Sequence, residues 1–411
     1  MCRYLLKLLL LVVLAALASF SINAQEVEDT IKIKTRVVFL DALVKDKKTN
    51  LPISNLIPEH FEVLDDGKPR SISYFTREGQ ARKPLALILI LDLREDGAGR
   101  FLKRPEILKA MEDELAKLPP GDEVAIMAMD IAEDEERVWL TEFTSDRAKL
   151  AAALARVPAM CGPDDGVPPQ GVSSTAQKTD GNAGKPDDIV HTEVIQGRNG
   201  STVTRTTRRD GSVNVKRTDK KGNVTVEMGD VYDMAAAVRD ATRKAEEMRP
   251  NSQTSIVWVS DGIAPIFFED RDATEQILIR NNVIFNSLTV ELRTLFKFLM
   301  PIGKPVAGWV GLSIYGSAKH LAQKSGGEAV KVGRVKDYGS GLSRIIGNLT
   351  ARYSLGFQLA ESETDDGRML NLEVRVKAKD DKGKNRKLQV SSRQGYYLSS
   401  TVPKEAAAKA Q

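Results

Sequence analysis

The sequence contains few of the side chains that most catalytic and metal centres use. Among its 411 residues are only two cysteines and three histidines. Cys2 belongs to a segment that we expect to be removed on export, so the mature chain keeps only Cys161 and forms no internal disulfide. The histidines, His60, His191 and His320, stand in three separate segments without the spacing of a metal motif. We therefore expect neither a histidine-based metal site nor a cysteine–histidine nucleophile pair.

Motifs that cradle phosphates or activate a nucleophile are also missing. There is no Gly-x-Ser-x-Gly elbow, no Walker A loop and no Gly-x-Gly-x-x-Gly after an apolar strand; Gly97-Ala98-Gly99 lacks the third glycine. Neither sign of charge dominates, because the formal charge of +4 falls to +2 once Arg3 and Lys7 are removed. A near-neutral chain has no general attraction to nucleic acid or to membranes. We expect no catalytic residues and no nucleic-acid partner.

The first 24 residues predict a secretory signal peptide. Arg3 and Lys7 form a positive region, residues 8–17 are apolar, and Ser21-Ile22-Asn23-Ala24 offers a cleavage site before Gln25. The apolar run is short for a membrane span, although an uncleaved anchor is the alternative. We therefore expect an exported protein, periplasmic or extracellular, with no integral membrane segment after cleavage.

An uninterrupted apolar run, Leu85 to Leu91, ends at Asp92. Such a run predicts a strand buried on both faces, in the middle of a parallel sheet. A second apolar strand, Thr254–Ser260, ends at Asp261. Carboxylates at the carboxyl ends of parallel strands can face each other across the crevice where open α/β sheets bind ligands. They could equally be ordinary residues at strand ends.

The rhythm of the predicted elements divides the chain. Strands and helices alternate over 83–157 and 231–351, which predicts a Rossmann-like, doubly wound, mostly parallel sheet flanked by antiparallel β segments. The segments are the signal peptide (1–24), an N-terminal β-sandwich-like domain (25–82), the two parts of the α/β domain (83–157 and 231–351), an insertion between them (158–230), a C-terminal β segment (352–399) and a polar tail (400–411).

The insertion differs in composition from both of its neighbours. A flexible loop rich in glycine and proline precedes three short predicted strands in 201–228, so we expect a β-hairpin insertion that adds little to the main core. Residues 198–221 hold eight Lys or Arg against two Asp, a local charge of +6. These charges form either a contact surface for an anionic partner or a solvated hairpin that resists aggregation. The segment has no aromatic residue on which single-stranded nucleic acid could stack.

Four motifs in this order resemble a von Willebrand factor type A (VWA) domain: the strand that ends at Asp92, PPGDEVAI (Pro119–Ile126), FTSDR (Phe143–Arg147) and IVWVSDG (Ile256–Gly262). The flanking motifs are similar to those of secreted VWFA-related proteins of the acidobacterial type: FEVLDDGKP (Phe61–Pro69), YSLGF (Tyr353–Phe357) and RQGYY (Arg393–Tyr397). The resemblance covers nearly all of 35–399 except the insertion. It implies a Rossmann-like domain that binds other proteins, often through a metal at the carboxyl edge of the sheet.

The metal motif of the family is degenerate in this chain. The family pattern is Asp-x-Ser-x-Ser after the first strand, a threonine in a later loop and the aspartate of a strand-end Asp-Gly. Asp92 and Asp261 match, but Arg94 and Asp96 replace the serines, and no threonine stands near Met228-Gly229-Asp230. The resemblance implies a ligand-binding edge of Asp92, Arg94, Asp96, Asp230 and Asp261.

Arg94 decides what we expect of a metal at this edge. Its guanidinium can pair with two carboxylate oxygens at once and so take the place of the cation. We therefore expect no cofactor. If Arg94 turns to solvent instead, Mg²⁺ or Ca²⁺ would use Asp92, Asp96 and Asp261, with Asp230 adding negative charge.

The sequence thus predicts a non-enzymatic adhesion or scaffold protein that binds an unidentified protein partner. The alternative is a metal-dependent hydrolase built on the acidic crevice at Asp92, Asp96 and Asp261. That alternative is weaker because no histidine or lysine base accompanies the carboxylates.

Overall fold

The structure is a computed structural model. It describes residues 36–77, 82–94, 98–129, 137–160, 188–209, 213–228, 234–264, 266–290, 311–313, 316–360, 362–380 and 382–398. The predicted signal peptide and the polar tail lie outside the described residues, as do two members of the expected ligand-binding edge, Asp96 and Asp230.

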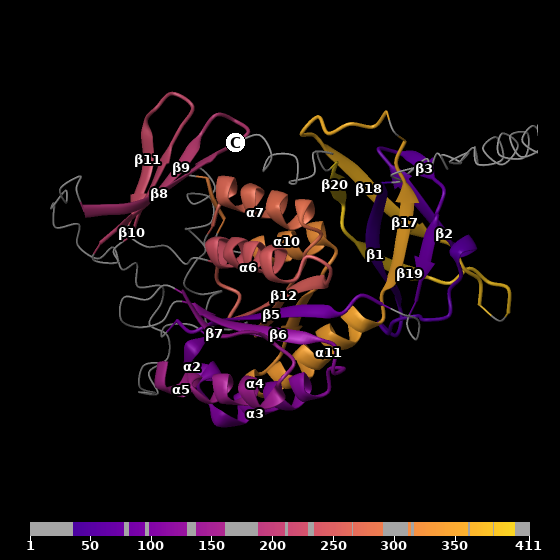
Figure 1. Ribbon diagram of the computed structural model, residues 1–411, viewed down its shortest axis with the longest axis horizontal. Coiled ribbons are helices and arrows are strands. Elements are labelled where there is room, and N and C mark those ends of the chain that lie inside the picture. Colours follow the sequence, from indigo (N-terminus) through magenta and orange to yellow (C-terminus); the bar gives the residue numbers. More distant parts are fainter. Residues whose placement is uncertain are drawn as a thin grey trace, which may run out of the picture. The chain divides into compact units, whose positions relative to one another are not determined.

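A six-stranded sheet with the order β16-β14-β12-β5-β6-β7 is the central element of the fold (Figure 1). Every neighbouring pair is parallel except β6 with β7. Its strands are β5 (Leu85–Asp92), β6 (Glu123–Met129), β7 (Arg137–Thr144), β12 (Gln253–Ser260), β14 (Ile284–Val290) and β16 (Ala329–Val332). All of β5 is buried, as its unbroken apolar run predicts.

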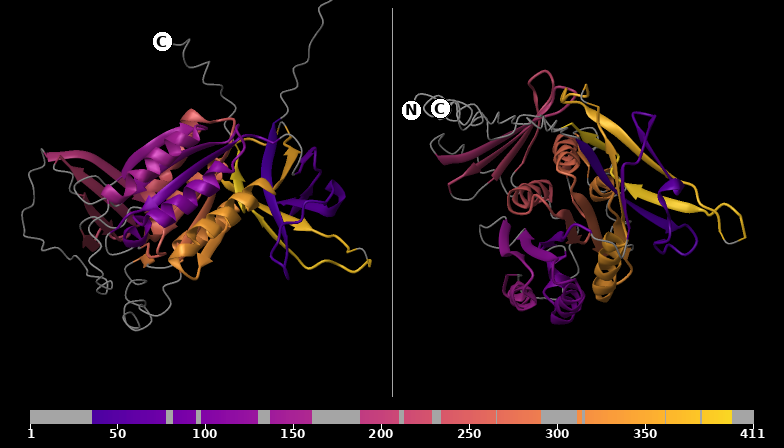
Figure 2. Two further views of the ribbon diagram at one scale, coloured as in Figure 1. Left: turned by 90° about the horizontal axis from the view of Figure 1, so that it is seen from below. Right: turned by 45° about the vertical axis from the view of Figure 1, so that its right-hand side comes forward.

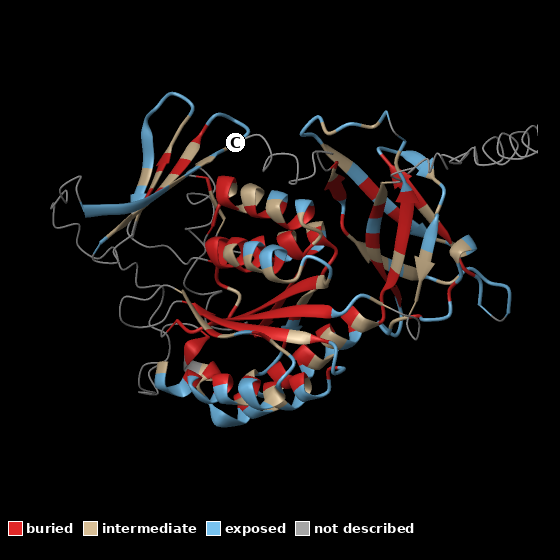
Figure 3. Ribbon diagram, in the orientation of Figure 1, coloured by how far each residue is buried: buried red, intermediate tan, exposed pale blue. Residues whose placement is uncertain are grey.

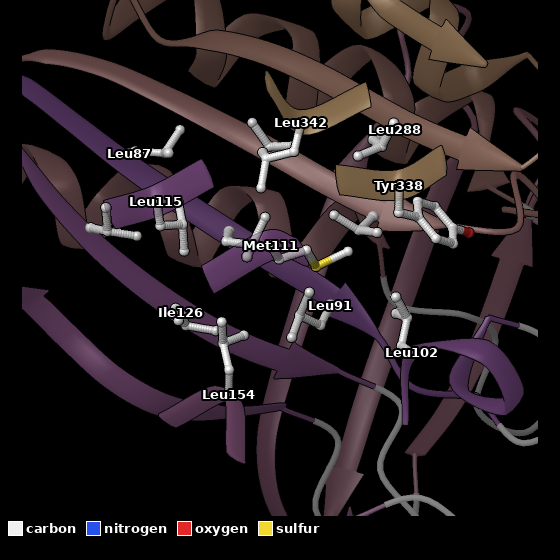
Figure 4. Packing of buried hydrophobic residues seen from close by; sticks show 14 of the residues in the cluster. Leu87, Leu91, Leu102, Met111, Leu115, Ile126, Leu154, Leu288, Tyr338 and Leu342 are labelled. Atoms are coloured by element: carbon white, nitrogen blue, oxygen red, sulfur yellow. The ribbon is translucent and has the colours of Figure 1, made fainter. Parts of the chain in front are cut away.

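Helices cover both faces of this sheet. Side chains alternate across a strand, so Leu87 and Leu91 of β5 pack on one face, where Figure 4 shows them with Met111 and Leu342, while Ile88 packs on the other. The first face carries α3 (Pro105–Ala116), α4 (Arg147–Ala155) and α11 (Tyr338–Thr350), and the second carries α6 (Met234–Met248), α7 (Phe268–Arg280) and α10 (Ser317–Ser325). The expected doubly wound α/β fold is confirmed.

Short elements connect these layers. They are α2 (Gly99–Leu102), α5 (Val157–Met160), the single-turn helices η1 (Pro58–His60) and η3 (Val335–Asp337), and the two-stranded sheet of β13 (Ile266–Phe267) and β15 (Leu312–Ser313). Among the described helices, none combines the length and the apolar character that crossing a membrane requires.

Two antiparallel four-stranded sheets, β19-β1-β17-β4 and β20-β18-β2-β3, flank the α/β part. Their strands are β1 (Val37–Asp46), β2 (Phe61–Asp65), β3 (Lys68–Arg70), β4 (Tyr74–Thr76), β17 (Tyr353–Gln358), β18 (Met369–Val376), β19 (Leu388–Ser392) and β20 (Gly395–Tyr397). Strands from before and after the central sheet therefore pair within the same two sheets. Buried side chains of both origins, including Leu40, Val63, Phe357 and Tyr396, share one core.

The insertion forms an antiparallel sheet with the order β11-β10-β9-β8. Its strands are β8 (Ile189–Gln196), β9 (Thr202–Arg208), β10 (Val213–Thr218) and β11 (Val224–Met228), one strand more than the sequence predicts. Most of it is exposed or half-buried, in contrast to the central strands (Figure 3). Its small apolar cluster joins Val203 and Val215 to Phe267, which directly precedes α7.

Candidate functional site

Asp92 and Asp261 lie at the carboxyl ends of neighbouring parallel strands. β5 and β12 are paired in parallel up to Leu91 and Val259. The acidic residue that follows in each strand therefore lies at the same edge of the sheet. Both residues are buried, with exposed fractions of 1% for Asp92 and 7% for Asp261. Two carboxylates in so little water require a compensating positive charge or a proton.

Arg94 supplies that charge from the loop after β5. Its Nε donates to Asp92 Oδ1 at 2.9 Å and its Nη2 donates to Asp92 Oδ2 at 2.8 Å, the two-point pairing that a guanidinium fork allows. The same Nη2 also donates to Asp261 Oδ1 at 3.0 Å and to the Ile263 carbonyl at 2.8 Å. The pairing that we expected of Arg94 is thus present, and Arg94 bridges both strand ends.

Two further side chains complete this edge. Ser260 Oγ donates to Asp92 Oδ2 at 2.6 Å, and the hydroxyl of Tyr338 donates to the Ser260 carbonyl at 2.9 Å. We call Asp92, Arg94, Ser260 and Asp261 the arginine cage. Ser260 is not among the residues that the sequence predicts at this edge, although it stands beside Asp261 in the strand-end motif. Tyr338 belongs to α11, and no local signal links it to the cage.

The backbone around the cage depends on two glycines. A Cβ at Gly99 would lie 2.1 Å from the Leu93 carbonyl oxygen and 2.7 Å from that of Arg94, so only glycine fits where the loop folds back. The Gly99 amide donates to the Arg94 carbonyl at 3.0 Å. Gly262 has a φ of +88°, which turns the chain so that the Ile263 amide donates to Asp261 Oδ1 at 2.9 Å.

The cage holds two carboxylates against one guanidinium, and this imbalance affects Asp261. Burial raises the pKa of Asp261 to about 6; the charge of Arg94 lowers it, and that of Asp92 raises it. Burial also raises the pKa of the Tyr338 hydroxyl, with the charges of Asp261 and Asp92 acting in the same direction. Tyr338 therefore remains a neutral hydrogen-bond donor.

The oxygen atoms described at this edge are not arranged to bind a resident divalent cation. Mg²⁺ and Ca²⁺ need several free oxygen ligands, whereas both oxygens of Asp92 already accept hydrogen bonds from Arg94. A fixed guanidinium charge beside them would repel a second cation. Within the described ranges, no three His, Cys, Asp or Glu side chains are grouped so that they could hold a metal ion.

Part of the positive charge of the insertion is used inside the protein. Arg217 Nη2 pairs with Glu269 Oε1 of α7 at 2.9 Å, and Arg205 Nη1 lies 3.7 Å from Asp270 Oδ1. All four side chains are buried. Burial raises the pKa of Glu269, but hydrogen bonds from Arg217 and Ser201 outweigh it, so the pKa is lowered overall. Buried ion pairs thus join the insertion to α7, while four other cations stay exposed: Arg198, Arg209, Lys220 and Lys221.

Strand β8 forms one edge of the insertion sheet and carries unusually exposed apolar side chains. The exposed fractions are 46% for Ile189, 57% for Val190 and 58% for Val194. Among the described strands, β8 pairs only with β9, and no other described strand covers its other side. Figure 2 shows the strands of the insertion side by side in one sheet. Open apolar edges of this kind are templates for an additional strand.

No protein-family profile matches the chain, and no curated protein matches it. Several solved structures are similar in fold. A von Willebrand factor type A protein from Catenulispora acidiphila covers 85% of this chain and 76% of its own, with a TM-score of 0.37 and 9% identity. The von Willebrand factor domain of the pilus tip protein Mfa5 from Porphyromonas gingivalis covers 66% of this chain and 96% of its own, with a TM-score of 0.29 and 11% identity. The pilus adhesin SpaC from Lactobacillus rhamnosus GG covers 84% of this chain and 48% of its own, with a TM-score of 0.34 and 8% identity.

Proposed function

We propose that this chain is an exported, non-enzymatic protein that binds an extended acidic segment of another protein along strand β8. The observation that carries the proposal is the open edge of β8, with Val190 and Val194 more than half exposed. A partner strand added there would gain main-chain hydrogen bonds, and the apolar side chains would supply further contact area.

The exposed charges around β8 favour an acidic partner. Arg198 follows β8, Arg209 follows β9, and Lys220 and Lys221 form the turn between β10 and β11. Complementary charge accelerates association and selects among partners more than it adds affinity. Ion pairs between the insertion and α7, such as Arg217 with Glu269, would hold the edge against a rigid support.

The arginine cage supports binding that does not depend on a metal. It also argues against the metal-dependent hydrolase, because Asp92 is buried and accepts hydrogen bonds from Arg94 and Ser260 on its oxygens. A carboxylate in that state has little capacity to bind a cation or to take a proton from water.

Site-specific photo-cross-linking tests the proposal. A photoreactive residue at Val194 should capture a partner on intact cells, whereas the same residue at Lys109, 62% exposed on α3, should not. A synthetic peptide from the captured region should then be acidic and bind the purified chain. Val190→Lys with Val194→Lys should abolish that binding, because charges on an edge strand oppose strand addition.

Two outcomes would refute this function. One is equal capture from both positions; the other is peptide binding that survives the double substitution. Removal of divalent ions with a chelator should leave peptide binding unchanged. A turnover screen of the purified chain with added Mg²⁺ or Ca²⁺ would reveal the hydrolase if it exists.

A further inference from the structure

A cavity of about 220 Å³ lies beside the arginine cage, at the carboxyl edge of the central sheet. Asp261, which directly follows β12, is one of its lining residues. Ser287 and Thr289 come from β14, and Lys331 comes from β16. Lys319 belongs to the first turn of α10. Segments that are far apart in the sequence therefore meet around one space.

The register of the sheet shows which side chains of β14 and β16 face this cavity. The two strands are parallel, with Ser287 opposite Ala329 and Thr289 opposite Lys331. Side chains alternate across a strand, and Leu288, between the two β14 residues, packs on the face that α11 covers. Ser287, Thr289 and Lys331 therefore project from the other face, which α10 covers.

Two hydroxyl groups of this lining are buried and unused. Ser287 is 2% exposed and Thr289 is 7% exposed. The described residues provide neither hydroxyl with a hydrogen-bond partner. Neither oxygen is among the described polar atoms that are both unpaired and fully enclosed, so a molecule in the cavity can reach both. Each hydroxyl can donate one hydrogen bond to an acceptor placed there.

Two lysines give the lining its free charge. Lys319 and Lys331 are exposed, and neither forms an ion pair with a described residue. The side chain of Asp261 is only 1% exposed and pairs with Arg94, so its charge is partly offset within the cage. Helix α10 also begins here without a side-chain cap, and an uncapped helix start favours an anion. The cavity therefore favours an anion and repels a metal ion.

The size and the donors of the cavity together select a phosphate group. Sites for larger organic molecules measure roughly 300–1,000 Å³, so a smaller cavity suits a compact ligand. A phosphate monoester carries a charge of about −1.5 to −2 at neutral pH and has three strong acceptor oxygens. Lysine is a common partner of phosphate, as a point charge. A carboxylate has one charge and two oxygens, so it would match two lysines and two hydroxyls less completely.

We propose that this cavity binds a phosphate group, either as free phosphate or as the head of a phosphate ester. Ser287 and Thr289 donate hydrogen bonds to its oxygens, and Lys319 and Lys331 offset its charge. The site is independent of the proposed strand addition at β8, because the two share no residue.

Calorimetric titration of the purified chain tests this site with two probes, inorganic phosphate and glycerol 3-phosphate, against chloride at the same ionic strength. At least one probe should bind, and the two arms distinguish the free ion from an ester. Lys319→Gln with Lys331→Gln should weaken that binding by about tenfold or more, the usual consequence of losing charged hydrogen bonds. Ser287→Ala should weaken it by a smaller factor. Lys324→Gln, on the same helix α10 but outside the lining, should leave it unchanged.

The proposal is overturned if neither probe binds more tightly than chloride, or if the double lysine variant binds as well as the parent chain. Equal weakening by Lys324→Gln and by Lys319→Gln alone also overturns it, because the attraction would then come from surface charge in general. Thermal unfolding without a probe shows whether each variant is folded. If Ser287→Ala does not fold, Thr289→Val takes its place: unchanged affinity in the folded hydroxyl variant likewise overturns the proposal.

Discussion

Two buried arginines at opposite ends of one parallel sheet are in opposite states. Arg94 and Arg352 are equally hidden, each 6% exposed. Arg94 donates to two carboxylates and a carbonyl, whereas Arg352 donates to one carbonyl and leaves two nitrogens unused. The extent of burial alone therefore does not predict how a charged side chain affects stability. Its surroundings determine whether the charge stabilises or destabilises the fold.

The same substitution at the two positions should therefore give different results, and the largest effect is expected at Arg94. Arg94→Met removes the only cation of the cage and leaves Asp92 and Asp261 buried together. Breaking a buried ion pair from one side costs about 3–5 kcal/mol, and urea unfolding at neutral pH measures it. Arg344→Met, a partly exposed arginine of α11, is the control and should stay within about 0.5 kcal/mol.

Substitution of Arg94 also tests whether this arginine takes the place of a divalent cation. Without Arg94 the cage keeps two buried carboxylates, which could bind a divalent cation. Arg94→Ser should therefore recover stability when millimolar Ca²⁺ or Mg²⁺ is added, while the stability of the parent chain should not change. Sub-millimolar binding of either ion to the parent chain, lost in Asp92→Ala, would show that the arginine does not replace the cation.

A smaller effect is expected at the loop that positions Arg94. Gly99→Ala places a Cβ 2.1 Å from the Leu93 carbonyl oxygen, so the loop must move. Forcing an atom into a packed site costs about 1–3 kcal/mol. Gly121→Ala is a matched control, because a Cβ there meets nothing within 4 Å. Equal unfolding midpoints for the two variants would contradict the idea that the loop holds Arg94 in place.

A further test is how the free energy of unfolding depends on pH through Asp261. Folding raises the pKa of Asp261 from 3.8 to about 6, so the folded state binds the proton more tightly. The resulting stability is complete below about pH 4 and is lost as the pH rises through 6. Relative to Asp261→Asn, the parent chain should lose on the order of 2 kcal/mol between pH 4 and 7. Parallel stability curves for the two proteins would rule out a raised pKa.

The smallest effect is expected at Arg352. Arg352→Met removes one hydrogen bond to Gly326 together with two unused buried donors. These contributions oppose each other, so the free energy of unfolding should change by less than about 1 kcal/mol in either direction. A loss as large as that of Arg94→Met would mean that Arg352 is a structural residue and would remove the contrast between the two ends.

The sequence by itself determined the elements whose burial follows from the local pattern of apolar residues. The unbroken run from Leu85 to Leu91 predicted β5 as a strand buried on both faces, as is usual in parallel sheets that helices cover on both sides. Alternating strands and helices predicted the sheet type, and the shared direction of parallel strands placed Asp92 and Asp261 at one edge. The fork of Arg94 predicted its pairing with carboxylates, because that chemistry depends on one side chain.

The tertiary structure decided every feature that depends on which distant segments meet. The β segments at the two ends of the chain pair within shared sheets, and hydropathy patterns do not specify partners some 300 residues apart. Glu269 and Asp270 are buried at the start of α7, and no local pattern predicts buried acids there. Their cationic partners come from distant segments: Arg217 and Arg205 from the insertion, and Arg239 from α6. Arg352 likewise reads as an ordinary surface cation. In the fold it is buried and donates to the Gly326 carbonyl, and burial is a property of the surroundings rather than of the residue.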